Sequence, residues 1–201
     1  MKLGPTERVR RMFRRRGLVR PRDLEKAGLP TSVLYRLRDQ GEVEQVGPGL
    51  FRHPGAATTE KHTYAEAAKL VPAGAVCLLS ALAFHEIGTQ MPHEVWLALR
   101  AHSKRPTVTA VPLRIVWFSG EAFTEGVETH TVEGVRVRVY SPAKTIADLF
   151  KFRNKVGIDV AVEALRDAWS RRIVTMEEII HFAKVCRVEK VIRPYLEAII
   201  A

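Results

Sequence analysis

Residues 28–52 read GLPTSVLYRLRDQGEVEQVGPGLFR, and this stretch decides the fold of the N-terminal part of the chain. Pro30 opens a predicted helix over residues 31–40, in which an apolar stripe is formed by Val33, Leu34 and Leu37. Another face of the same helix carries side chains at positions i, i+3, i+4 and i+7, namely Ser32, Tyr35, Arg36 and Asp39. The spacing predicts a helix that packs with one face and leaves the other face open to a partner.

Two shorter helices are expected before this segment and a hairpin after it. Apolar side chains at helical spacing predict an amphipathic helix over residues 6–16. A proline and a glycine bracket a second helix over residues 22–27. Residues 43–46 and 50–53 are expected to form short strands around a Gly-Pro-Gly turn at residues 47–49. Three short helices and a hairpin together predict a winged helix-turn-helix.

The polar face of the third helix is a candidate for reading DNA, because an α-helix fits the major groove and presents its side chains to the base edges. Arg36 is the best candidate for base readout, since a guanidinium donates two hydrogen bonds to guanine. The other predicted DNA-binding residues are Ser32 and Tyr35, for bases or phosphates, and Arg20, Arg22, Arg38 and Arg52, for the backbone. The alternative interpretation is that these arginines form a solvated surface.

The charge of the chain is concentrated at its beginning. The 201 residues include 32 Lys or Arg and 22 Asp or Glu, for a formal net charge of +10. Residues 1–55 hold 13 of the basic and 6 of the acidic residues, whereas residues 56–201 hold 19 and 16. This distribution favours a polyanionic partner for the N-terminal part.

A change of composition at residues 55–59, which are small, indicates a domain boundary. We therefore predict a winged helix-turn-helix DNA-binding domain over residues 1–55 and an α/β domain over residues 56–201. The expected strands of the second domain are 95–100, 113–119, 127–132 and 135–140, the last two joined by a Glu133-Gly134 turn. The expected helices are 60–70, 78–87, 142–152, 158–170, 175–186 and a final segment ending at Ala201. The fold class is α+β, with a small, mostly antiparallel sheet and a helical C-terminal half.

Enzyme and membrane motifs are missing from the sequence. It contains no G-x-x-x-x-G-K-[ST] loop, no H-E-x-x-H pair, no G-x-S-x-G elbow and no acidic-x-Lys signature of metal-dependent nucleases. Cys77 and Cys186 stand in apolar surroundings and are expected to be buried thiols, and His85 is expected to be structural. No apolar run approaches the ~20 residues that span a bilayer. We expect a cytoplasmic, non-enzymatic protein with no catalytic residue, cofactor or metal.

The most distinctive stretch of the second half is residues 139–154, VYSPAKTIADLFKFRN. A polar stripe at positions i, i+4, i+7 and i+11 is formed by Lys144, Asp148, Lys151 and Lys155, and Lys144 is placed to pair with Asp148 across one turn. The stripe, with Arg153, is a candidate surface for a protein or nucleic-acid partner. An ordinary solvated face is the alternative. Further along, Thr175 and Glu178 have the spacing of a capping box.

Several short motifs follow one another along the chain, at residues 23–24, 28–30, 34–37, 47–52, 79–82 with His85, and 139–148. In this order they resemble the AbiEi-type antitoxins of type IV toxin–antitoxin systems, over almost the whole length. The resemblance implies a winged helix-turn-helix that binds inverted repeats in its own promoter, and a C-terminal domain with antitoxin activity. It also implies a nucleotidyltransferase-like toxin as the functional partner, without implying a stable complex. The candidates for an antitoxin surface are then Lys144, Asp148, Lys151 and Arg153.

The first hypothesis for the function is a sequence-specific repressor that regulates its own operon and serves as an antitoxin. It would bind double-stranded DNA at an inverted-repeat operator, as a dimer or as two cooperative monomers, and have no membrane partner. Three alternatives stay open. They are a stand-alone regulator without a toxin, a nuclease-like effector that the winged domain directs to DNA, and a second domain that serves only to bind proteins. The missing acidic-x-Lys signature argues against the nuclease.

Overall fold

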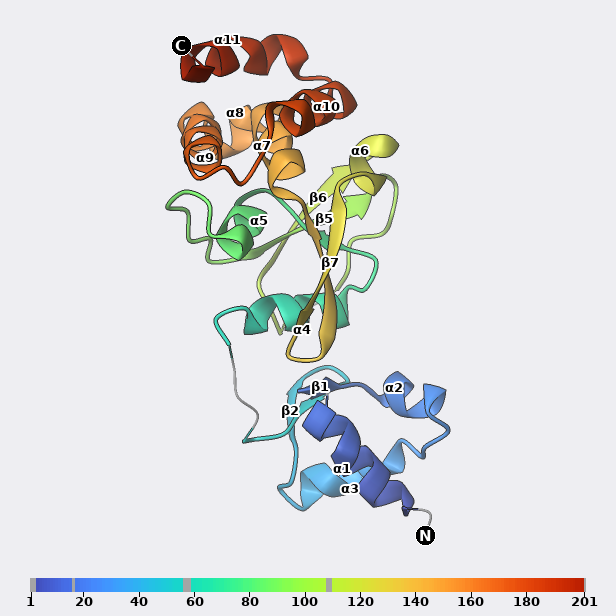
Figure 1. The fold of residues 1–201 in the computed structure, drawn as a ribbon. Coiled ribbons are helices and arrows are strands. Elements are labelled where there is room, and N and C mark those ends of the chain that lie inside the picture. Colours follow the sequence, from blue (N-terminus) through green and yellow to red (C-terminus); the bar gives the residue numbers. More distant parts are fainter. Residues whose placement is uncertain (1–2, 16, 56–58, 108–109, 201) are drawn as a thin grey trace. The chain divides into compact units, whose positions relative to one another are not determined.

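The computed structural model describes residues 3–15, 17–55, 59–107 and 110–200 (Figure 1). The chain divides into two compact units, of which the first comprises residues 1–72, 106–112 and 130–137, and the second comprises residues 73–105, 113–129 and 138–201. The domain boundary predicted after residue 55 stays a prediction. Three sequence-based expectations extend beyond the described residues, because residue 16, residues 56–58 and residue 201 are not among them.

The first unit begins with three helices, α1 (Pro5–Arg15), α2 (Pro21–Lys26) and α3 (Ser32–Asp39), close to the predicted positions. Leu24 of α2 is fully buried among apolar side chains of α1 and α3, including Val9, Phe13, Leu34 and Leu37. Each side chain of this kind contributes roughly 1.5–3 kcal/mol when it is removed from water. The apolar stripe of α3 is therefore what fixes the helix against its neighbours.

The hairpin that follows α3 belongs to a three-stranded antiparallel sheet in the order β1-β3-β2. Its strands are β1 (Leu18–Val19), β2 (Glu44–Gly47) and β3 (Leu50–Arg52). Gly49 in the connecting turn has φ +62°, a conformation that is costly for residues with a Cβ. The predicted hairpin is confirmed, and β1 is an additional strand that pairs Leu18 with Arg52. Three helices and this sheet make the winged helix-turn-helix.

Two later segments complete the first unit. Helix α4 (His62–Leu70) is joined to α2 by an ion pair in which Lys69 Nζ lies 2.8 Å from Asp23 Oδ2. The predicted turn between β7 (Val127–Val132) and β8 (Val135–Tyr140) is confirmed, with φ +50° at Glu133 and +73° at Gly134. Positive φ at both central residues is what a type I′ hairpin turn requires. The carbonyl of Glu133 accepts a hydrogen bond from the Gly17 amide at 3.1 Å, immediately before β1.

A five-stranded sheet has the order β6-β5-β4-β8-β7 and includes β4 (Ala75–Val76), β5 (Val95–Arg100) and β6 (Leu113–Phe118). Strand β4 pairs antiparallel with β5, but β5 pairs parallel with β6 and β4 pairs parallel with β8. The α+β class is confirmed, whereas the sheet is mixed rather than mostly antiparallel. Parallel neighbours need a connection of a dozen or more residues, and twelve positions of the sequence separate the end of β5 from the start of β6.

Helix α7 (Pro142–Lys151) is the centre of the helical packing in the second unit (Figure 1). Its contacts include α5 (Leu78–His85), α9 (Ile158–Ser170), α10 (Met176–Cys186) and α11 (Glu189–Ile200). Two four-residue helices, α6 (Glu121–Thr124) and α8 (Arg153–Val156), were not predicted. Cys77 and Cys186 are buried free thiols, as expected. His85 is half-buried, with Nε2 2.8 Å from the Tyr140 carbonyl oxygen.

Within the described part of the chain, every helix falls short of the length and apolarity that crossing a bilayer requires.

Candidate nucleic-acid interface

Helix α3 separates its side chains into a packed face and an open face. Val33, Leu34 and Leu37 are buried in the core of the first unit. The side chains at the predicted reading positions are exposed, namely Ser32, Tyr35, Arg36 and Asp39. The structure thus brings the predicted DNA-reading residues together on one solvent-facing surface of a helix that is held by its opposite face.

Arg36 and Tyr35 are positioned by neighbouring elements rather than by α3 alone. The guanidinium of Arg36 donates from Nη2 to Thr6 Oγ1 of α1 at 2.7 Å and remains exposed. The Tyr35 ring, which is 42% exposed, makes an edge contact with Phe51 of β3, with ring centroids 5.6 Å apart. Both side chains are therefore braced at one end and open to solvent at the other, which reduces the conformational entropy lost on binding.

Arg38 contacts both the end of α3 and the wing. Its guanidinium donates to Asp39 Oδ1 at 2.9 and 3.0 Å and to Gln45 Oε1 of β2 at 3.3 Å. The same guanidinium carbon lies 5.3 Å from the centre of the Tyr35 ring. Asp39, placed on the open face by the sequence, is thus partly neutralised by Arg38. An exposed pair of this kind is weak enough for a phosphate to replace the carboxylate.

Arg20 and Arg22 lie at the start of α2. Arg22 is exposed and Arg20 is half-buried. Burial, and then the neighbouring charge of Arg22, lower the pKa of Arg20, so the two guanidinium groups repel each other across a partly desolvated space. The Asp23 carboxylate accepts a hydrogen bond from the Arg20 backbone N–H at 2.9 Å, and this bond caps the N-terminus of α2. The arrangement favours the approach of an anion to α2.

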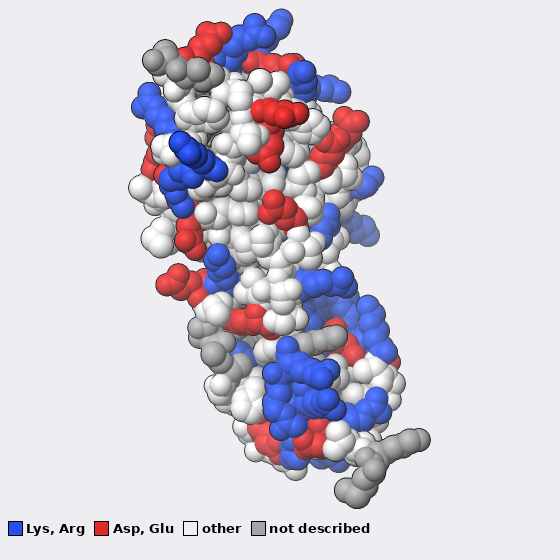
Figure 2. Space-filling model, viewed as in Figure 1, with Lys and Arg blue, Asp and Glu red and all other residues white. Residues whose placement is uncertain are grey.

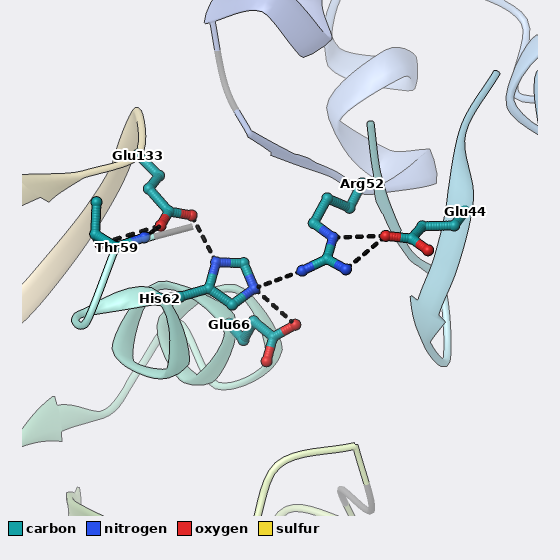
Figure 3. A network of polar contacts seen from close by, with 6 residues as sticks. All are labelled: Glu44, Arg52, Thr59, His62, Glu66 and Glu133. Carbon is teal, nitrogen blue, oxygen red and sulfur yellow. Dashed lines mark hydrogen bonds and ion pairs between the residues drawn. The ribbon is translucent and has the colours of Figure 1, made fainter. Parts of the chain in front are cut away.

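Arg52, the predicted phosphate contact of the wing, is held by other protein groups (Figure 3). It stands opposite Glu44 in the β2–β3 ladder, and Nε lies 2.7 Å from Glu44 Oε1. Its Nη1 lies 3.4 Å from His62 Nε2 on the other side. Arg52 is thus paired and half-buried, whereas Arg22, Arg36 and Arg38 are exposed.

A polar network extends from Arg52 to the β7–β8 turn and joins residues that lie far apart in the sequence. His62 Nδ1 lies 2.6 Å from Glu133 Oε2, and the Thr59 amide donates to Glu133 Oε1 at 2.7 Å (Figure 3). The other ring nitrogen of His62, Nε2, faces both Arg52 Nη1 and Glu66 Oε1, each at 3.4 Å. The only signal in the sequence was the position of Glu133 in an expected turn, since its partners lie more than seventy residues earlier.

Basic side chains gather over the first unit on the face shown in Figure 2. Some of the arginines of α1 are neutralised. Arg10 forms two hydrogen bonds with Glu42, at 2.7 and 2.8 Å, and Arg14 pairs with Glu7 at 2.5 Å. Hydrogen bonds from Arg14 and Arg10 hold the pKa values of Glu7 and Glu42 below their usual range. These ion pairs offset part of the positive charge of α1.

The candidate antitoxin surface of the second unit needs correction. Lys144 and Asp148 are 0% exposed, so they lie neither on a partner surface nor on a solvated face. They pair across one turn of α7 as predicted, but in the core, because α10 covers that side of α7. Lys151 is exposed, and Arg153 is half-buried with Nη1 3.0 Å from the Phe150 carbonyl oxygen. A partner-binding role for these two stays a prediction.

A comparison with protein families finds a match within the first unit. Residues 7–54 match the family described as "Transcriptional regulator, AbiEi antitoxin". No curated protein matches the chain. The crystal structure of the RV2827C protein from Mycobacterium tuberculosis is similar, with a TM-score of 0.57 and 17% identity over 90% of this chain and 71% of that chain. At this identity the likeness shows the fold alone. Over residues 7–54, the resemblance found in the sequence is therefore confirmed as a resemblance to AbiEi antitoxin transcriptional regulators.

Proposed function

We propose that the protein is a sequence-specific, DNA-binding repressor of its own operon, and that α3 enters the major groove. The observation that carries the proposal is the division of α3, which buries Val33, Leu34 and Leu37 and exposes Ser32, Tyr35 and Arg36. A helix that serves only to pack on the surface would not need an arginine and a tyrosine held in place on its solvent-facing side. The match of residues 7–54 to a family of transcriptional regulators supports the same function.

The exposed residues take different roles in this proposal. Arg36 reads a guanine through two hydrogen bonds, exchanging Thr6 for the base edge. Ser32 and Tyr35 contact bases or phosphates from the same face. Backbone contacts come from Arg20, Arg22 and Arg38, and from Arg52 if it exchanges Glu44 for a phosphate. An inverted-repeat operator then binds two copies of the chain, as a dimer or as cooperative monomers.

The antitoxin function rests on the family resemblance. The protein would be cytoplasmic and would counteract a nucleotidyltransferase-like toxin encoded beside it, without a stable complex. Lys151 and Arg153 are the remaining candidates for this activity. The chain is proposed to be a regulator and not an enzyme. Two alternatives to the antitoxin remain. A stand-alone regulator would have no toxin partner, whereas a nuclease-like effector would cut DNA.

Operator binding is tested with the duplex upstream of the protein's own gene and a scrambled duplex of the same length, in fluorescence anisotropy titrations. Arg36→Ala is expected to weaken operator binding by about 1–3 kcal/mol, which is roughly 5- to 150-fold, and to affect the scrambled duplex much less. The matched control is Arg166→Ala, because Arg166 is an exposed arginine of α9 in the second unit. Equal losses of Arg36→Ala on both duplexes would overturn the base-reading role.

The antitoxin function is tested by co-expressing the full chain with the neighbouring nucleotidyltransferase-like reading frame. Rescue of growth is expected, and it should persist in the Arg36→Ala variant if antitoxicity and operator binding are separate. Failure of the wild-type chain to rescue growth would remove the antitoxin function and leave the stand-alone regulator. Cleavage of plasmid DNA with Mg²⁺ or Mn²⁺ that survives repurification would favour the nuclease-like effector.

A further inference from the structure

A basic cleft lies within the first unit, and the described residues that line it do not include any of α3. It is formed by the start and end of α2, the last turn of α4 and the β7–β8 turn, and it has a volume of about 620 Å³. Of the residues that the structure describes, five basic side chains line it, namely Arg20, Arg22, Lys26, Lys69 and Arg136, together with one carboxylate, Asp23. Three separate segments of the chain thus contribute positive charge to one concave surface.

The carboxylate in the cleft does not offset most of this charge. Asp23 accepts the Arg20 backbone N–H at 2.9 Å and pairs with Lys69 Nζ at 2.8 Å, where both side chains are largely buried. Among the described residues, none forms an ion pair within 4 Å with Arg22, Lys26 or Arg136, and all three are exposed. The repulsion between these like charges destabilises the free protein, and a bound anion would relieve that repulsion.

The chemistry of the lining selects the kind of anion. Guanidinium groups match phosphate oxygens and lysine adds a mobile point charge, so the cleft suits phosphate. The lining contains no aromatic side chain among the described residues, and its apolar contribution is limited to Ala68, Pro72 and Val135. A surface without a stacking platform is suited to a sugar–phosphate backbone rather than to a nucleobase.

We propose that this cleft grips backbone phosphates of the operator duplex outside the base pairs that α3 reads, with Lys26 and Arg136 as the principal contacts. The proposal rests on the proposed function and extends the DNA-binding surface beyond residues 1–55. In helix-turn-helix proteins the helix before the reading helix faces the DNA backbone, and α2 holds that place here. Arg136 adds a cation from the β7–β8 hairpin to the side of α2 that faces the cleft.

The test compares the single variants Lys26→Gln and Arg136→Gln and the double variant with the wild type on the promoter duplex at several salt concentrations. Each lost phosphate contact is expected to reduce the slope of log K against log salt by about 0.9 and to weaken binding about 5- to 10-fold near 0.1 M salt. The loss should be the same on scrambled DNA. The matched control is the double variant Arg166→Gln/Lys190→Gln, since both residues are exposed in the second unit.

Ethylation interference locates the contact. Alkylating a contacted phosphate is expected to weaken binding of the wild type and of the control, but not binding of Arg136→Gln. Variants with unchanged slope and unchanged interference would overturn the cleft and leave operator reading by α3 intact, provided that Arg36→Ala still weakens operator binding. Equal slope losses in the control variant would also overturn it, because they would indicate overall charge only. Absence of DNA binding by the wild type would overturn both proposals.

Discussion

Lys144 and Asp148 form an ion pair in the interior of the second unit, with Nζ 2.5 Å from Oδ2 and both side chains 0% exposed. The Cys186 thiol donates to the other carboxylate oxygen at 3.1 Å, and the ammonium lies 4.0 Å from the centre of the Tyr140 ring. Burial raises the pKa of Asp148, and the Lys144 ammonium opposes that effect. The pair is tolerated because each charge compensates the other.

Removing one partner of this pair is expected to destabilise the second unit. Asp148→Asn should lower the free energy of unfolding by about 3–5 kcal/mol, because it leaves the Lys144 ammonium buried without a counter-charge. The double variant Lys144→Met/Asp148→Asn should lose less than the sum of the two single losses. Urea unfolding followed by circular dichroism measures the free energy of unfolding of Lys144→Met, of Asp148→Asn and of the double variant.

Lys151→Met is the control for this prediction, since Lys151 lies on the same helix but is exposed, and its effect should stay within about 0.5 kcal/mol. Additive losses in the double variant would contradict the compensated pair.

Gly126 is also expected to be intolerant of a side chain, because a Cβ there would lie 2.7 Å from Lys144 Cβ.

Among the elements, α10 shows how far local sequence determines local structure. The capping box predicted from the spacing of Thr175 and Glu178 is present, with the Glu178 amide donating to Thr175 Oγ1 at 3.2 Å and the Thr175 amide donating to Glu178 Oε2 at 2.8 Å. The two residues satisfy each other's backbone donors at the start of the helix, so no distant partner is needed. The position of this start was predictable for that reason.

Thr175→Ala is expected to cost about 1 kcal/mol, because the Glu178 amide loses its acceptor. Thr175→Ser keeps the hydroxyl and should stay close to the wild type. The measurement is the midpoint of urea unfolding at constant m-value. If Ala and Ser variants have the same midpoint, the cap contributes nothing measurable to stability.

The strands β1 and β4 were not predicted, because they lack a local signal of the kind that marks the start of α10. Each has two residues, Leu18–Val19 and Ala75–Val76, all of them buried. Alternation of polar and apolar residues is the signal of a half-buried strand, and two residues are too few to show it. They are strands only because β3, β5 and β8 supply hydrogen-bond partners from elsewhere in the chain.

At the scale of the whole molecule, the first unit is built from three separate stretches of the chain. Residues 130–137 belong to it through Glu133, whose carboxylate accepts hydrogen bonds from Thr59 and contacts His62. Burial by itself would raise the pKa of Glu133, but the Thr59 amide and His62 outweigh burial, so that its pKa lies below the usual range. The carboxylate is therefore expected to stabilise the unit only while it is ionised.

The pH dependence follows from the direction of that shift. A folded-state pKa below the unfolded value means that the stabilisation is present above about pH 4 and is lost as the pH falls through the folded-state pKa. Glu133→Gln should therefore be less stable than the wild type at pH 7, and the difference should shrink toward pH 3. Urea unfolding at pH 7, 5, 4 and 3 measures it.

The control for the pH series is Glu177→Gln, because Glu177 is exposed at the start of α10 in the second unit. Its stability difference from the wild type should show no comparable convergence in acid. A Glu133→Gln difference that stays constant from pH 7 to pH 3 would show that the carboxylate charge does not hold residues 130–137 in the first unit.

The sequence by itself determined the helices longer than four residues, the wing and the open face of α3, because helical periodicity, caps and turn residues act within a few positions of one another. It placed Ser32, Tyr35 and Arg36 on one surface, and the structure agrees. Only the tertiary structure decided what covers each polar stripe. On α7, packing of α10 turned an expected surface into a buried ion pair, and around α2, α4 and the β7–β8 turn it assembled a basic cleft from residues over a hundred positions apart. Burial and charge clustering depend on distant segments, and no local pattern encodes which segments those will be.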